Sequence, residues 1–269
     1  MDITLAAELL ILGACIGFLA GLLGIGGGMM MVPFLSIILT NRGVEPNLAF
    51  KMAIATSMAT ILFTAISSVR AHHRRGAVRW DIVRGLAPGI VLGGLLAGAG
   101  IFALVKGKVL ILVFVLFLTF SATQMLMDKK PRPTRAMPGW RGQTAAGTGI
   151  GLLSGLVGAG GAFASAPFMT WCNVPMHNVV ATSAALGFPI AAANTLGYLI
   201  GGWSLQPPLP GAFGYLYVPA LAVIAAGSML MAPQGARAAH ALNVKQLKRV
   251  FSLMLYSLAA YMLWKALHA

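Results

Sequence analysis

Acidic residues are scarce in this chain of 269 residues. Only five Asp and Glu stand against nineteen Lys and Arg, and the five acids (Asp2, Glu8, Glu45, Asp81 and Asp128) lie in loops or at the ends of apolar segments. A carboxylate inside an apolar segment would mark a cation site or a proton relay. Its absence there disfavours a cation transporter.

Cysteine is scarcer still, and the motifs of several enzyme classes are missing. Cys15 and Cys172 do not belong to a CxxC pair, so the sequence holds no metal or redox motif, and both fit as small side chains in helices. No nucleotide-binding P-loop is present, so the chain itself does not hydrolyse ATP. We expect no enzyme, and therefore no catalytic residue, no metal and no cofactor.

Charge of either sign is uncommon, at 9% of residues, whereas 58% are hydrophobic. This composition is far too apolar for a soluble domain, and several runs approach or exceed the roughly 20 residues that cross a bilayer as a helix. The runs are continuously apolar, which indicates helices and not barrel strands. We expect an all-α polytopic membrane protein embedded in the lipid bilayer, with about eight hydrophobic segments: 4–39, 52–69, 83–105, 108–127, 143–172, 178–200, 213–232 and 249–267.

The net charge of +14 would suggest nucleic acid as a partner in a soluble chain. Here the basic residues sit in short loops between apolar segments, where the orientation of membrane spans explains them better. We therefore expect no nucleic-acid partner. The first twenty residues contain no Lys or Arg, so they lack the basic region of a secretory signal and are interpreted as part of the mature fold.

The chain is an internal duplication. Two Gly-rich stretches, GLLGIGGGMMMVPF at 21–34 and GLVGAGGAFASAPF at 155–168, repeat at an offset of 134. At this offset Gly17, just before the first stretch, and Gly21, Gly24, Gly26, Gly27, Pro33 and Phe34 within it all meet an identical residue. A Thr-Ser pair also recurs, at 56–57 and 182–183. These repeats predict two homologous transmembrane halves, 1–127 and 143–269, joined by a Pro-rich basic linker at 128–142.

Loop charges favour inverted halves over parallel ones. If each Gly-rich segment crosses the membrane once, the basic residues divide eleven to eight, which is a feeble bias. If each segment turns back as a re-entrant helix pair, the halves are inverted. Fourteen basic residues then lie on one side of the membrane, and five lie on the other: Arg42, Lys51, Lys106, Lys108 and Lys265. The loops 70–84, 128–142 and 233–249 would then be cytoplasmic. Residues 4–23 are nevertheless long enough to span by themselves.

The glycine clusters predict helix breaks that bind an anion. Glycine in a helix interior costs up to about 1 kcal/mol relative to alanine, and a broken helix is tolerated in a membrane only where it lines a cavity or lies within protein. The helix that restarts after a break presents unpaired N–H groups, which attract an anion. We expect these starts to bind substrate through Gly24, Gly26, Gly27, Gly28, Met29, Gly158, Gly160, Gly161 and Ala162. The alternative is close helix packing, which we favour for Gly17, Gly21, Gly151 and Gly155.

Other polar positions are candidates for the same site. The hydroxyls of Thr56, Ser57, Thr182 and Ser183 could bind the anion or, equally, bond back to their own helix carbonyls. Lys51 and His177 precede the two pairs and could attract an anion, although interfacial cations at helix ends are the more common use. Asn194 lies inside a segment, where bonding between helices is the alternative to gating. The helix prolines that accompany the breaks, also considered for gating, are Pro33 and Pro167.

The paired glycine motifs, each followed by a Thr-Ser segment, together with RRGAVRWD at 74–81, resemble the sulfite exporter TauE/SafE family, also called the toluene sulfonate uptake permeases. The resemblance covers nearly the whole chain. It implies transport of sulfite, sulfonates or related sulfur or organic anions across the bacterial inner membrane. The second half departs from the pattern, because it lacks a counterpart of Asp81 and has Ala162 in place of a third glycine.

We therefore expect a secondary transporter that moves a small anion by alternating access between its halves. A passive anion channel and an intramembrane thiol-redox protein are the alternative functions. The sequence leaves open the identity of the anion, the direction of transport, the coupling ion and the formation of a homo-oligomer.

Overall fold

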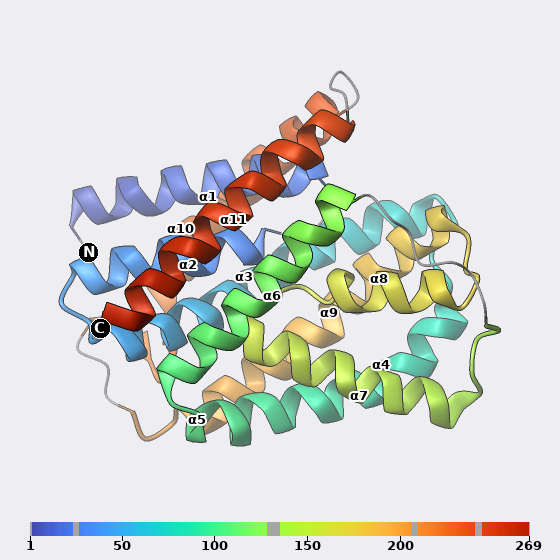
Figure 1. Ribbon diagram of the computed structural model, residues 1–269, viewed down its shortest axis with the longest axis horizontal. Helices are drawn as coiled ribbons and strands as arrows, with labels where there is room; N and C mark the ends of the chain where they lie inside the picture. Colours follow the sequence, from blue (N-terminus) through green and yellow to red (C-terminus); the bar gives the residue numbers. More distant parts are fainter. Residues whose placement is uncertain (1, 24–26, 128–134, 206–208, 240–243, 269) are drawn as a thin grey trace.

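The computed structural model describes residues 2–23, 27–127, 135–205, 209–239 and 244–268, and it is almost entirely helical (Figure 1). The first half contains α1 (Ile3–Leu23), α2 (Gly28–Asn41), α3 (Pro46–Arg74), α4 (Trp80–Leu95), the π-helix η1 (Leu96–Ile101), α5 (Phe102–Leu104) and α6 (Gly107–Met127). The second half contains α7 (Trp140–Val157), α8 (Ala162–Trp171), α9 (Met176–Gly201), the short strands β1 (Ala212–Phe213) and β2 (Leu216–Tyr217), α10 (Val218–Ala239) and α11 (Val244–His268).

Seven helices in the described ranges are long and apolar enough to cross a membrane, where the sequence predicts about eight apolar segments. The difference arises at the glycine clusters. Segment 4–39 divides into α1, which is one of the seven, and the shorter α2 of 14 residues. Segment 143–172 divides into α7 and α8, and neither of these is among the seven. The all-α, multi-pass architecture expected from the composition is confirmed.

Both glycine-broken segments fold into helical hairpins. The guanidinium of Arg42, directly after α2, lies 3.3 Å from the Asp2 carboxylate and 3.4 Å from that of Glu8, near the start of α1. In the second half, the N–H of Arg135 donates to the carbonyl of Trp171 at 3.4 Å, and its guanidinium lies over the Trp171 ring. Each second helix therefore returns to the end of the bundle where the first one begins.

Helices from opposite halves pack closely through glycines. A Cβ on Gly17 of α1 would overlap the backbone of Ser228 in α10, and a Cβ on Gly151 of α7 would overlap that of Ile90 in α4. Within the second half, Gly155 of α7 is covered by the side chain of Asn194 in α9. The packing role predicted for these three glycines is confirmed, because any larger residue would push the helices apart. The fourth glycine predicted to pack, Gly21, instead lines the cavity described below.

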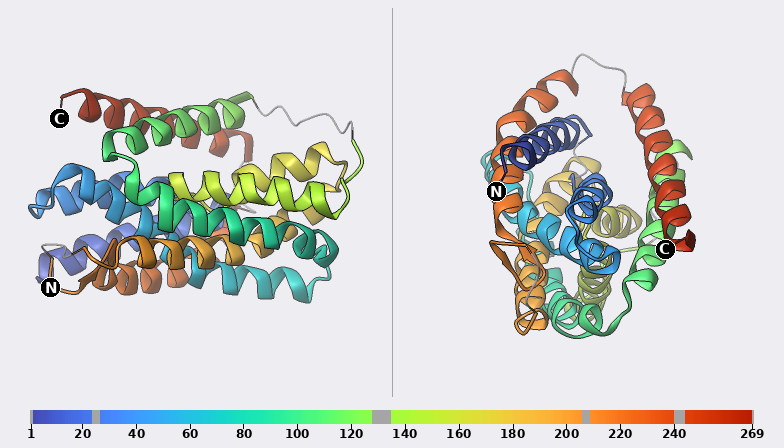
Figure 2. Two further views of the ribbon diagram at one scale, coloured as in Figure 1. Left: turned by 90° about the horizontal axis from the view of Figure 1, so that it is seen from below. Right: turned by 90° about the vertical axis from the view of Figure 1, so that its left-hand side faces the viewer.

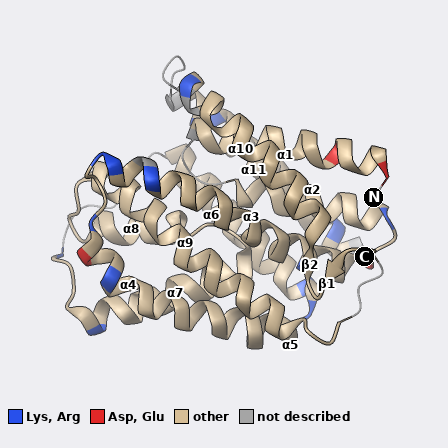
Figure 3. Cartoon of the chain, turned by 180° about the vertical axis from the view of Figure 1, so that it is seen from behind, with Lys and Arg blue, Asp and Glu red and all other residues tan. Residues whose placement is uncertain are grey.

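Most helices run along the long axis of the molecule, whereas the α6–α11 pair lies at one side and crosses that axis obliquely (Figures 1 and 2). Of the seven apolar helices, α3 and α9 are the most buried. Helix α1 begins and α11 ends at the same end of the bundle (Figure 2). Many of the Lys and Arg residues gather at the other end, around the starts of α4 and α7, the end of α10 and the start of α11 (Figure 3). Of the linker expected at 128–142, residues 128–134 lie outside the described residues.

Candidate functional site

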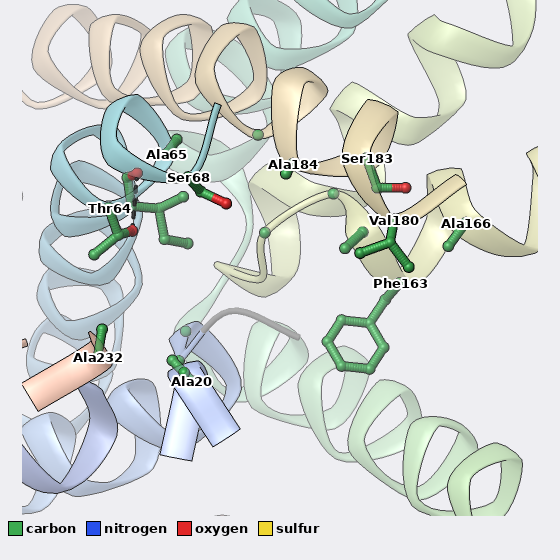
Figure 4. Close-up of a pocket in the computed structure, with 18 of the residues that line it drawn as sticks. Ala20, Thr64, Ala65, Ser68, Phe163, Ala166, Val180, Ser183, Ala184 and Ala232 are labelled. Atoms are coloured by element: carbon green, nitrogen blue, oxygen red, sulfur yellow. Dashed lines mark hydrogen bonds between the residues drawn. The ribbon is translucent and has the colours of Figure 1, made fainter. Parts of the chain in front are cut away.

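A cavity of about 760 Å³ lies where the two halves meet. The breaks in both hairpins reach its wall, through Gly27 and Gly28 at the start of α2 and through Gly160 and Gly161 at the start of α8. Helices α1, α3, α9 and α10 complete most of the wall, as Figure 4 shows for Ala20, Ala65, Ala184 and Ala232. The fold thus brings together two glycine clusters that are 134 positions apart in the sequence.

The serines of the two Thr-Ser pairs lie on the cavity wall. Ser57 Oγ is 3.4 Å from the carbonyl oxygen of Gly28 and 3.5 Å from that of Gly158, so it links α3 to both breaks. Ser183, whose side chain is labelled in Figure 4, accepts at its Oγ a hydrogen bond of 3.0 Å from Ser165 Oγ of α8. Its own proton is therefore available for another acceptor.

The threonines of the same pairs lie outside the cavity. Thr56 Oγ1 accepts a hydrogen bond of 3.1 Å from the backbone N–H of Tyr217, just before α10. Thr182 Oγ1 accepts one of the same length from the N–H of Arg79, just before α4. Adjacent residues on a helix point about 100° apart, so the serine of each pair faces the cavity while the threonine faces the other half.

The mouth of the cavity is basic. His72, near the end of α3, and Lys248, near the start of α11, line it where these helices meet the loops predicted to be cytoplasmic. Among the described residues that form the wall there is no Asp or Glu. A wall without acidic residues in its described part and with the ammonium of Lys248 at its mouth attracts anions and gives a cation no counter-charge.

Of the other residues predicted at the two glycine clusters, some line the cavity and others do not. Gly24 and Gly26 lie outside the described residues. Gly158 ends α7 in the left-handed conformation, with φ of 68°, which an L side chain adopts only with strain. Gly158 and Met29 are buried but are not part of the wall, whereas Ala162 is. Of the two helix prolines, Pro167 lines the cavity and Pro33 does not.

Lys51 does not line the cavity. Its ammonium donates to the carbonyl of Ala103 at 3.2 Å and lies over the rings of Phe102 and Tyr215, at 5.7 and 5.6 Å from their centroids. His177 is exposed near the start of α9 and does not line the wall.

Asn194 is fully buried, and its Nδ2 donates to its own helix at the carbonyl of Ile190, 2.8 Å away. It does not line the cavity.

A stripe of hydroxyls on α3 was not among the residues predicted from the sequence. After Ser57, the residues Thr60, Thr64 and Ser68 also line the cavity, and Figure 4 shows Thr64 and Ser68 on this helix. Their spacing of three or four residues places them on one helix face. That periodicity was available in the sequence, whereas nothing there marked Phe163 of α8 as part of the wall.

The chain matches a family model described as "Sulfite exporter TauE/SafE" over residues 9–262. The chain belongs to this family. A probable membrane transporter protein of Haemophilus influenzae is 34% identical to it, over 95% of this chain and 97% of its own length. The probable membrane transporter protein MJ0441 of Methanocaldococcus jannaschii is 24% identical over 95% and 94% of the two chains. The probable membrane transporter protein YunE of Bacillus subtilis is 28% identical over 72% and 78%. No solved structure matches.

TauE/SafE proteins are membrane transporters, so this chain is a transmembrane transporter and not an enzyme. The resemblance stated from the glycine motifs is confirmed. The cavity between the hairpins is accordingly the candidate transport site of this TauE/SafE chain.

Proposed function

We propose that the chain is a secondary transporter that carries a small anion across the bacterial inner membrane by alternating access. The observation that carries this proposal is the central cavity, which lies between two glycine-started helices and has hydroxyls on its wall and the ammonium of Lys248 at its mouth. Membership of the TauE/SafE family supports sulfite, a sulfonate or a related sulfur anion as the substrate.

The two halves act as inverted repeats in this proposal. Helices α1 and α7 open their halves and run in opposite directions (Figures 1 and 2). Equivalent hydrogen bonds also join the halves in both directions. Thr56 of the first half accepts the N–H just before α10 in the second half, and Thr182 of the second half accepts the N–H just before α4 in the first half. Such an exchange is expected of a pseudo-two-fold axis in the membrane plane. In transporters of this type the substrate site lies near the midplane, between the repeats.

The anion binds between the two helix starts. Neither Gly27, at the start of α2, nor Gly161, at the start of α8, gives a side-chain cap to the first N–H groups of its helix. Those groups carry roughly half a positive charge per helix and are a suitable donor set for an oxyanion. Ser57 and Ser183 add hydroxyls, so we assign the anion contact to the serines and a structural role to Thr56.

A carrier fits better than a channel because the described cavity wall runs from Ser57 to His72 in α3, stops at Gly187 in α9 and includes no described residue of α4 or α7, so it opens toward the end of the bundle where α3 ends and α9 begins. With the basic loops 70–84, 128–142 and 233–249 in the cytoplasm, this conformation faces inward. A singly charged anion leaving a negative-inside cell gains about 2.3 kcal/mol per 100 mV, so export needs no further coupling.

The thiol-redox alternative loses support from both cysteines. Cys15 and Cys172 are free thiols. Burial raises the pKa of the Cys172 thiol, although the charge of Arg135 acts in the opposite direction. A raised pKa disfavours the reactive thiolate. We expect a variant with Cys15→Ser and Cys172→Ser to transport at the rate of the wild-type protein. Loss of transport in that variant, with its fold intact, would revive a redox role.

The test is sulfite uptake into proteoliposomes, with unlabelled sulfate, sulfoacetate, thiosulfate or acetate as competitors. Gly160→Leu is the blocking variant, because Gly160 lines the cavity and a Cβ there would meet nothing nearer than the Ile61 side chain, at 3.7 Å. Gly149→Leu is the matched control on an exposed position of α7, where a Cβ would meet nothing within 4 Å.

We expect saturable uptake, lost in Gly160→Leu and retained in Gly149→Leu, with the competition pattern giving the substrate class. Uptake that survives Gly160→Leu would remove the cavity from the transport path. Conductance in a planar bilayer, without saturation or counterflow, would replace the carrier with a channel.

A further inference from the structure

Helices α3 and α9 correspond residue by residue through the Thr-Ser pairs. The offset between Ser57 and Ser183 is 126, and adding it to 68 and 72 gives Asn194 and Tyr198. Ser68 and His72 line the open cavity near its mouth. Their counterparts therefore identify the part of α9 that an equivalent cavity on the other side of the membrane would expose.

In the present conformation that part of α9 is closed. Asn194 and Tyr198 both have 0% exposure, and the Tyr198 hydroxyl donates a hydrogen bond to the carbonyl of Gly155 in α7. Gly155 is the counterpart of Gly21 by the offset of 134, and Gly21 lies on the open wall. The gap between the first and third helices of a repeat is thus open in the first half and closed in the second.

A buried polar atom lies in the closed gap. Asn194 Oδ1 has no hydrogen-bond partner in the described structure, and it faces the backbone of Gly155. An unpaired buried oxygen costs free energy, and opening the gap to water or to a ligand would remove that cost. The gap therefore combines a hydrogen bond that holds it shut with a polar group that gains a partner when it opens.

We propose that Tyr198, Gly155 and Asn194 form the outer gate of the transporter, and that Asn194 and Tyr198 line an outward-facing cavity when this gate opens. The incoming anion would meet the hydroxyl of Tyr198 and the amide of Asn194 on its way to Ser183. In that state the first half closes, with His72 approaching Gly21 as Tyr198 now contacts Gly155. This inference rests on the proposed alternating access of inverted halves.

The test measures which face of the membrane reaches a reporter cysteine. In a background with Cys15→Ser and Cys172→Ser, Ala191→Cys reports the outer side, because Ala191 is fully buried and is the counterpart of Ala65 on the open wall. Ala65→Cys reports the inner side. The probe is the membrane-impermeant anion 2-sulfonatoethyl methanethiosulfonate, applied to whole cells and to inside-out vesicles.

Tyr198→Phe removes the gate hydrogen bond and keeps the ring. One neutral hydrogen bond corresponds to a shift of about fivefold, so we expect Ala191→Cys to be labelled about five times faster from outside. Tyr256→Phe is the matched control, because it removes a tyrosine hydroxyl that bonds Thr123 at 2.6 Å between α11 and α6, away from the gate. Labelling that is unchanged in Tyr198→Phe, or equally increased in Tyr256→Phe, would overturn the gate.

A reciprocal variant guards against a misfolded Tyr198→Phe. His72→Tyr places a hydroxyl opposite Gly21, where it would favour the conformation closed on the inside, so labelling of Ala65→Cys from the inner face should slow. An unchanged rate would count against the gate. Because labelling needs no substrate, a shift in these rates without sulfite transport would refute the proposed substrate alone. Transport without any shift would refute the gate alone.

Discussion

Replacing Thr56 with valine separates a structural role of this residue from contact with the anion. The side chain is fully buried, and its Oγ1 accepts the N–H of Tyr217, a residue that is itself 2% exposed. Valine keeps the shape and leaves that N–H without a partner, which costs about 1–3 kcal/mol. Thr182→Val should cost less, because its donor, the N–H of Arg79, lies at a surface position where water can replace the hydroxyl.

The assay is thermal unfolding of the purified protein in detergent, followed by sulfite uptake. For about 2 kcal/mol we expect the unfolding midpoint of Thr56→Val to fall by about 4–8 °C, with the KM for sulfite unchanged. Thr119→Val is the control, because its hydroxyl bonds only the carbonyl of Val115 in its own helix, and its midpoint should stay at the wild-type value. An unchanged midpoint with a raised KM in Thr56→Val would refute the reasoning and place Thr56 in the anion site.

Three further predictions concern packing, pH and binding. Gly151→Ala should lower the unfolding midpoint, since overpacking α7 against α4 costs about 1–3 kcal/mol, whereas Gly149→Ala on the exposed face should not; equal midpoints would contradict the packing. Burial raises the pKa of Glu45, but hydrogen bonds donated by Leu48 and Asn47 outweigh this effect and hold the pKa below its ordinary value. The carboxylate cap therefore stabilises α3 fully above the pKa of the unfolded state, and this stabilisation is lost as the pH falls through the lower pKa of the folded state. Glu45→Ala should be about 1 kcal/mol less stable than the wild-type protein at pH 7. In acid, the unfolding midpoints of the two proteins should become equal. Ser183→Ala should raise the KM for sulfite about tenfold and should also lower the unfolding midpoint, because the buried Ser165 hydroxyl loses its acceptor; an unchanged KM would exclude the contact with the anion.

The helical hairpins were predictable only in part. The glycine clusters indicated breaks, and the loop charges favoured segments that turn back, yet the length of α1 was also compatible with a simple span. The return of α2 is visible in the contact of Arg42 with Asp2 and Glu8, residues far apart in the sequence. A charge count along the chain carries no information on such a pairing, because the partners are chosen by packing.

The places of the candidate residues were also predictable only in part. Lys51 and His177 were alignable neighbours of the Thr-Ser pairs, but Lys51 packs on aromatic rings and His177 is exposed outside the wall. Sequence distance to a motif does not fix direction, since a side chain on a helix faces whatever its rotation about the axis presents. The tyrosine that closes the outer gap had no signal in the sequence, because its role depends on Gly155 in another helix.

The sequence by itself determined the apolar spans, the duplication and the sites of the helix breaks, because hydrophobic length, an offset of 134 and clustered glycines are local properties of the chain. Only the tertiary structure decided that Ser57 faces the cavity while Thr56 binds the backbone of the other half. The two residues are neighbours with similar hydroxyls. What separates them is the rotation of α3 within the bundle, and that rotation is fixed by the packing of both halves against it.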